Sequence, residues 1–171
     1  MMLGMSLATF TVVHVLISLI AIASGFVIVF GLIGGKRLDG WTTLFLITSA
    51  LTGITGFMFP FEKVTPGIVV GAILLIILAV AAVARYSFRM TGAWRGLYTI
   101  GATMSLYLNV FVLVVQSFEK VPALHALAPT GSEPAFVVAQ LLVLVAFIVL
   151  GTLATIRFRK VEEPRPVAHA A

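Results

Sequence analysis

The chain contains no cysteine, and few of its residues carry a charge. Among 171 residues only 10% are charged, whereas 61% are hydrophobic. Without cysteine the protein has no disulfides, thiolate nucleophiles, zinc–thiolate sites or cysteine-bound iron–sulfur clusters. A soluble domain with this mean hydropathy, +1.18, would lack the polar groups needed to cover its surface. The composition therefore predicts a protein whose solvent is lipid.

Five stretches are free of Asp, Glu, Lys and Arg, and each reaches the roughly 20 apolar residues that span a bilayer as a helix. They cover residues 1–35, 40–61, 64–84, 96–118 and 134–156. We expect an all-α polytopic membrane protein with five transmembrane helices in one bundle over residues 1–160. A disordered cytoplasmic tail is expected at 161–171. The helices are predicted at about residues 7–34, 41–61, 65–85, 96–118 and 134–157.

Basic residues between these stretches predict the orientation of the chain. Because Lys and Arg beside a spanning helix resist translocation, the side that carries more of them should be cytoplasmic. One side carries Lys36, Arg37, Arg85, Arg89, Arg95, Arg157, Arg159, Lys160 and Arg165; the other carries only Lys63 and Lys120, beside Glu62, Glu119 and Glu133. We therefore place the amino terminus outside the inner membrane and the carboxyl terminus in the cytoplasm. The basic residues indicate topology and not a nucleic-acid partner.

The first stretch also has one feature of a cleaved signal peptide. Ala21-Ile22-Ala23 has the small-x-small form of a cleavage site. No Lys or Arg precedes the apolar run, however, and the run continues to Ile33, beyond the length of a signal core. We expect this segment to remain as the first helix.

His14 is the only ionisable residue inside an apolar stretch, which makes it a candidate site. It shares a helix face with Ser18 and lies about two turns below the outer surface, at the depth of Gln116 and Gln140. We expect these residues and Asn109 to face an outward-opening polar pocket. The outer connections would contribute Glu62, Glu119, His125 and Glu133 to its rim. Asn109 and Gln116 either bond neighbouring helices or serve a ligand or proton pathway, because hydrocarbon offers amides no partner.

The residue types restrict the function without naming a ligand. No HExxH sequence, intramembrane carboxylate or phosphate-binding loop indicates an enzyme. Haem requires a second axial ligand, for which His125 is the nearest candidate, and His14, His125 and a carboxylate have metal-ligand chemistry without a diagnostic spacing. Three functions remain open: an accessory subunit or small-ligand binder without enzymatic activity, a quinone- or haem-associated redox protein using His14, and an oligomeric channel or transporter. The partners expected are lipid and another membrane protein or a second copy.

Short glycine-containing motifs between His14 and Pro60 resemble those of small predicted bacterial inner-membrane proteins without an assigned function. The similarity rests on His14, Ser24-Gly25, Gly31, Gly34-Gly35-Lys36 and Thr52-Gly53. That family commonly has a His-Arg pair in the first cytoplasmic loop, where this chain has Leu38-Asp39. The resemblance covers about the first third of the chain and implies membrane insertion but no activity.

Overall fold

The computed structural model describes residues 4–60 and 65–161, with side chains as far as Phe158. Within these residues the chain is helical and contains no strand, which confirms the all-α prediction. The helices are α1 (Leu7–Ile33), α2 (Asp39–Gly56), α3 (Pro66–Tyr86), α4 (Ala93–Lys120), the short α5 (Pro122–His125) and α6 (Pro134–Val161).

Four of these helices, α1, α3, α4 and α6, are long and apolar enough to cross a membrane. The 18-residue α2 is less apolar, since five threonines and Ser49 lie in it. Four of the five threonine hydroxyls donate to carbonyls of the helix itself: Thr48, for example, donates to the Leu44 carbonyl at 2.7 Å and Thr52 to the Thr48 carbonyl at 2.9 Å. Such bonds allow a threonine-rich helix to lie among apolar neighbours without unpaired donors.

The helix ends follow local sequence signals. Ser6 caps α1 by accepting from the Thr9 amide at 3.1 Å, and Thr65 with Pro66 begins α3. The prediction for the second helix was too long, because α2 ends at Gly56 in a tight turn. Pro60 disfavours helical geometry in the residue before it. Phe61, where this helix was predicted to end, lies outside the described residues.

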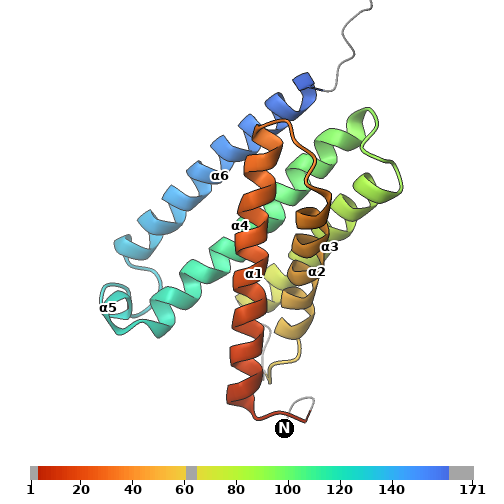
Figure 1. The fold of residues 1–171 in the computed structure, drawn as a ribbon. Helices are drawn as coiled ribbons and strands as arrows, with labels where there is room; N and C mark the ends of the chain where they lie inside the picture. The colour runs from red at the N-terminus through yellow and green to blue at the C-terminus, as the bar shows by residue number, and fades with distance from the viewer. Residues whose placement is uncertain (1–3, 61–64, 162–171) are drawn as a thin grey trace, which may run out of the picture.

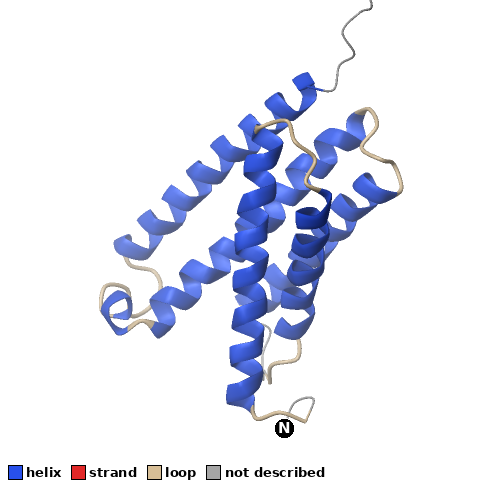
Figure 2. Cartoon of the chain, in the orientation of Figure 1, coloured by secondary structure: helices blue, strands red, loops and turns tan. Residues whose placement is uncertain are grey.

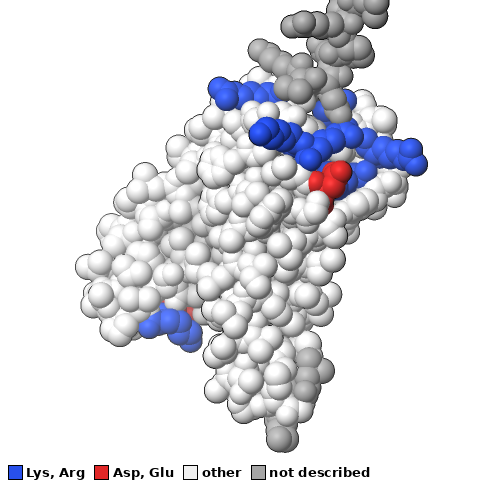
Figure 3. Space-filling view, viewed as in Figure 1, with Lys and Arg blue, Asp and Glu red and all other residues white. Residues whose placement is uncertain are grey.

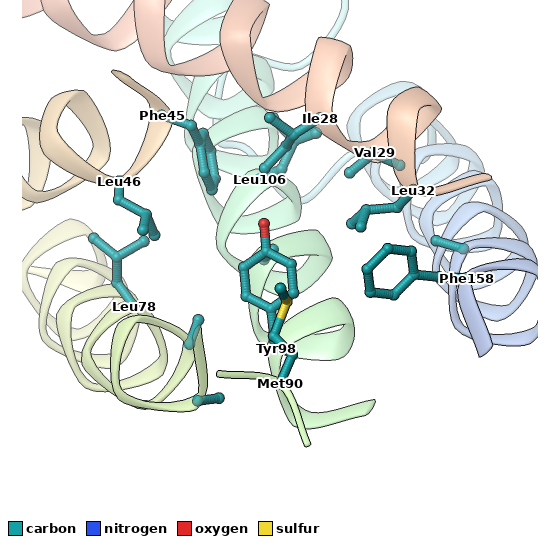
Figure 4. Packing of buried hydrophobic residues seen from close by; sticks show 14 of the residues in the cluster. Ile28, Val29, Leu32, Phe45, Leu46, Leu78, Met90, Tyr98, Leu106 and Phe158 are labelled. Carbon is teal, nitrogen blue, oxygen red and sulfur yellow. The ribbon is translucent and has the colours of Figure 1, made fainter. Parts of the chain in front are cut away.

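The central helix of the bundle is α4. Figures 1 and 2 show α1 crossing in front of it, α2 and α3 on one side, α6 running beside it on the other, and α5 at the turn between α4 and α6. In the apolar 18-residue segment of α4, 50% of the residues are buried inside the bundle. In the corresponding segment of α6, only 6% are buried. In the core, side chains from these helices meet around Tyr98 (Figure 4).

A close approach of three helices occurs at Gly25 of α1. A Cβ added there would lie 2.5 Å from Cδ1 of Leu106 and 2.8 Å from Cε2 of Phe45. Small residues permit such contacts between membrane helices, which associate through packing rather than through the hydrophobic effect. Gly25 therefore fixes where α2 and α4 lie against α1.

Candidate functional site

His14 makes its polar contact with α2. Its Nδ1 lies 2.7 Å from Oγ1 of Thr55, and the Thr55 hydroxyl donates its own proton to the Leu51 carbonyl at 2.6 Å. A hydroxyl has one proton, so when that of Thr55 is on the Leu51 carbonyl, Nδ1–H of His14 donates to Thr55. In the neutral ring Nε2 is then the nitrogen that accepts hydrogen bonds.

The surroundings of His14 come from the same end of α2 and the turn after it. The Phe59 ring meets the imidazole edge to face, with centroids 5.1 Å apart and planes at 84°. A Cβ added to Gly56 would lie 3.9 Å from Cε1 of His14. Ser18, one turn further along α1, donates to the His14 carbonyl at 2.8 Å. The half-buried imidazole is thus held by one hydrogen bond and one ring.

Gln116 and Gln140 have partners elsewhere. Gln116 is exposed and donates to Glu119, in its own helix, at 3.1 Å. Gln140 donates from α6 to the Phe111 carbonyl of α4 at 3.2 Å, and its Oε1 is buried without a partner. In the described part of the chain, no hydrogen bond joins either glutamine to His14.

The angle of α4 explains this separation. Tyr98, Ser105, Asn109 and Gln116 share one face of α4, and the first three are buried. Towards its carboxyl end α4 runs diagonally away from α1 and α2 (Figure 1), which leaves Gln116 exposed. The shared depth of His14 and Gln116 therefore does not place them side by side.

Asn109 joins α4 to α2. Its Nδ2 donates to Oγ of Ser49 at 3.2 Å and to the Ser105 carbonyl at 3.0 Å. Further along the same pair of helices, the hydroxyls of Tyr98 and Thr42 are 3.2 Å apart. For Asn109, this is the bonding between helices that one of its two interpretations predicted.

Glu133 organises the connection between α5 and α6. Its carboxylate accepts from the Thr130 amide at 3.0 Å, the Thr130 hydroxyl at 2.9 Å and the Ser132 amide at 3.0 Å. Desolvation raises the pKa of Glu133, but these hydrogen bonds outweigh it and lower the pKa to about 2.

The other predicted rim residues do not gather at one point. His125 is exposed in α5, Glu119 is bonded to Gln116, and Glu62 lies outside the described residues. Residues 4–60 and 65–161 contain no group of three His, Asp or Glu side chains placed to hold a metal.

Arg85 has a role that sequence analysis missed. It had been assigned only to topology, yet its side chain is 7% exposed, and its guanidinium donates to the carboxylate of Asp39 and to Sδ of Met90, 3.8 Å away. Its Cζ lies 5.3 Å from the centre of the Tyr98 ring and 5.7 Å from that of Tyr86. Asp39 was the available signal, since it is the only acidic residue on the predicted cytoplasmic side before the tail.

The connection between α3 and α4 has an unusual backbone, and it contains Met90, which contacts Arg85. Arg89 and Met90 both have left-handed backbones, with φ of 49° and 56°, a conformation that costs about 1–2 kcal/mol per residue. The turn returns Met90 to the core, where its amide donates to the Ala84 carbonyl at 2.9 Å. Phe88 stays at the surface and stacks on Trp94, with centroids 3.7 Å apart and planes at 2°.

Two apolar grooves lie on the surface of the bundle, and His14 lines neither. One, of about 490 Å³, runs between α2 and α3 and includes Thr43, Ala50, Ala82 and Tyr86. The other, of about 390 Å³, runs between α4 and α6 and includes Thr103, Tyr107, Phe147 and Gly151. Neither groove is the polar pocket predicted around His14.

Comparison of the chain with protein-family models, with curated proteins and with solved structures finds no match.

Proposed function

We propose that the chain is an integral protein of the inner membrane with five crossings, α2 being the fifth, and with its amino terminus outside. Figure 3 shows Lys and Arg side chains gathered mainly at one end of the molecule. That end contains the carboxyl ends of α1, α3 and α6 and the beginnings of α2 and α4 (Figure 1). The polypeptide therefore traverses the bundle once in each of five helices. The excess of basic residues makes this end cytoplasmic.

Within the membrane, the proposed role is that of an accessory subunit without enzymatic activity. The observation that carries this proposal is the low burial of α6. In its apolar 18-residue segment, only 6% of the residues are buried in the single chain. Most of the buried polar side chains have partners within the bundle: Asn109 bonds Ser49 and Tyr98 bonds Thr42, while Ser24, Thr48, Thr99 and Thr103 donate to carbonyls of their own helices. What the molecule offers its surroundings is an apolar helix face, on which Leu142 is 66% and Val145 57% exposed. Such a face suits a transmembrane helix of another protein or a second copy.

Single-cysteine cross-linking tests this role cleanly, because the chain has no cysteine of its own. Val145→Cys or Val149→Cys, treated in native membranes with a bifunctional maleimide, should give a cross-linked product. Ile76→Cys on α3 is the control, since that side chain is 66% exposed on a different helix. A product of twice the 18.2 kDa chain identifies a second copy, and another mass identifies a different protein. Equal yields at Ile76 and on α6, or no product on α6, contradict the proposal.

A second candidate function rests on the tautomer of His14. With Nδ1–H donated to Thr55, the imidazole offers Nε2 as an acceptor, which suits the hydroxyl of a quinol or a similar donor. It does not suit the carbonyl of a quinone, which needs a donor. Organic extracts of the purified protein should then contain a quinol that is lost from His14→Ala and reduced in Thr55→Val. Thr55→Ser, which keeps the hydroxyl, is the control, and extracts without quinol rule this candidate out.

A further inference from the structure

In the part of the chain that the structure describes, the basic end of the bundle has little acidic compensation. Lys36 follows α1, Arg89 lies between α3 and α4, and Arg157 is near the end of α6; all three are exposed. Figure 3 shows Lys and Arg side chains in a band across one end, with one acidic group visible beside them in that view. Two connections and the last turns of α6 thus bring positive charge to one end of the bundle.

The acidic group in this band is Asp39, which is already paired. Its carboxylate accepts from Arg85, whose side chain is held between the rings of Tyr86 and Tyr98. Because Arg85 is buried and fixed, the Asp39 carboxylate compensates the charge of that arginine. Within residues 4–60 and 65–158, the one carboxylate at this end is therefore paired with Arg85.

Both tryptophans of the chain lie at this end, where they mark the depth of the lipid headgroups. Trp41 is 47% exposed in the first turn of α2, and Trp94, half-buried in the first turn of α4, carries the stacked Phe88 ring. Amphipathic rings settle at the boundary between hydrocarbon and headgroups. The exposed basic residues are thus placed within reach of lipid phosphates.

We propose that Lys36, Arg89 and Arg157 form a rim that binds the phosphate headgroups of anionic phospholipids in the adjoining leaflet. The site takes a phosphodiester on a glycerolipid, and its selectivity comes from charge, because Lys and Arg close to a membrane surface attract anionic lipid. This inference rests on the membrane embedding given above and is independent of any partner for α6.

Quenching of tryptophan fluorescence by brominated lipid tests the proposal on the full chain, since both reporters are at the right end. The protein is reconstituted in phosphatidylcholine vesicles that contain brominated phosphatidylglycerol or brominated phosphatidylcholine. Brominated phosphatidylglycerol should quench at the lower mole fraction. Lys36→Gln, Arg89→Asn and Arg157→Gln should each weaken its relative association about fivefold. Asparagine is used at residue 89 because it tolerates a left-handed backbone.

Lys120→Gln, at the opposite end of α4, is the control and should leave the preference unchanged. Equal quenching by the two lipids in the wild-type protein overturns the proposal. So does an unchanged preference for phosphatidylglycerol in the variant that combines Lys36→Gln, Arg89→Asn and Arg157→Gln. Loss of the preference on adding glycerol phosphate, at constant ionic strength, assigns the site to a soluble phosphate and also overturns it. If neither brominated lipid quenches, the membrane embedding itself has failed, which distinguishes the two failures.

Discussion

Arg85, the penultimate residue of α3, donates to the carboxylate of Asp39, the first residue of α2, although the arginine side chain is 7% exposed and that of the aspartate 79%. The contact ties one end of α2 to one end of α3 and sets a cation against Tyr98 of α4. A charge buried in this way needs its partner, because removing one member of a pair leaves the other uncompensated.

Asp39→Asn should therefore destabilise the bundle by about 1 kcal/mol, a value reduced from that of a buried pair because Asp39 itself is exposed. Combining it with Arg85→Met should be less than additive, since the second change removes the charge that lost its partner. Thermal unfolding in detergent measures the free energy of unfolding of the wild-type protein, the two single variants and the double variant. Strict additivity shows that the two residues do not interact.

Thr55→Val should free Nδ1 of His14 and cost about 1 kcal/mol, a typical value for a hydrogen bond between membrane helices. Nitrogen NMR of the labelled imidazole should show a proton fixed on Nδ1 in the wild-type protein and exchange between both nitrogens in the variant. Thr55→Ser should behave as wild type. A wild-type ring protonated on Nε2 contradicts the assigned tautomer.

Ser49→Ala should destabilise the protein by about 1 kcal/mol, because it removes the α2 acceptor for the Asn109 amide in a buried contact. Ser117→Ala is a matched control, since that hydroxyl donates only to the Leu113 carbonyl of its own helix. Equal unfolding temperatures of the two variants would show that the bond between α2 and α4 contributes nothing.

Glu133 should make the connection before α6 sensitive to acid. Its pKa is about 2 in the folded protein and 4.5 in the reference state, so its stabilising contribution is present above pH 4.5 and disappears as the pH falls to 2. Hydrogen exchange of the Thr130 and Ser132 amides should accelerate over this interval, relative to the intrinsic rate. In Glu133→Gln the acid dependence should be absent, whereas Glu119→Gln should retain it.

The helices themselves were largely predictable because their determinants are local. Long uncharged stretches located the four helices that are long and apolar enough to cross a membrane, and Ser6 and Thr65 mark helix starts by accepting bonds from nearby amides. The end of α2 was misplaced because the uncharged stretch continues past Gly56, while the turn before Pro60 already stops the helix.

The sequence by itself determined that the chain is helical, that its charges lie between apolar segments and that His14 is the only ionisable residue inside one of them, because these follow from composition and periodicity along one helix. Only the tertiary structure decided which groups meet. Helical periodicity gives the direction of a side chain relative to its own axis, but not which neighbour that face will contact or at what angle the axes cross. The neighbours and the crossing angles are set by the packing of the helices, as at Gly25 and along the diagonal course of α4. In the folded bundle His14 lies against Thr55, Gln116 is exposed and Arg85 is buried beside Asp39.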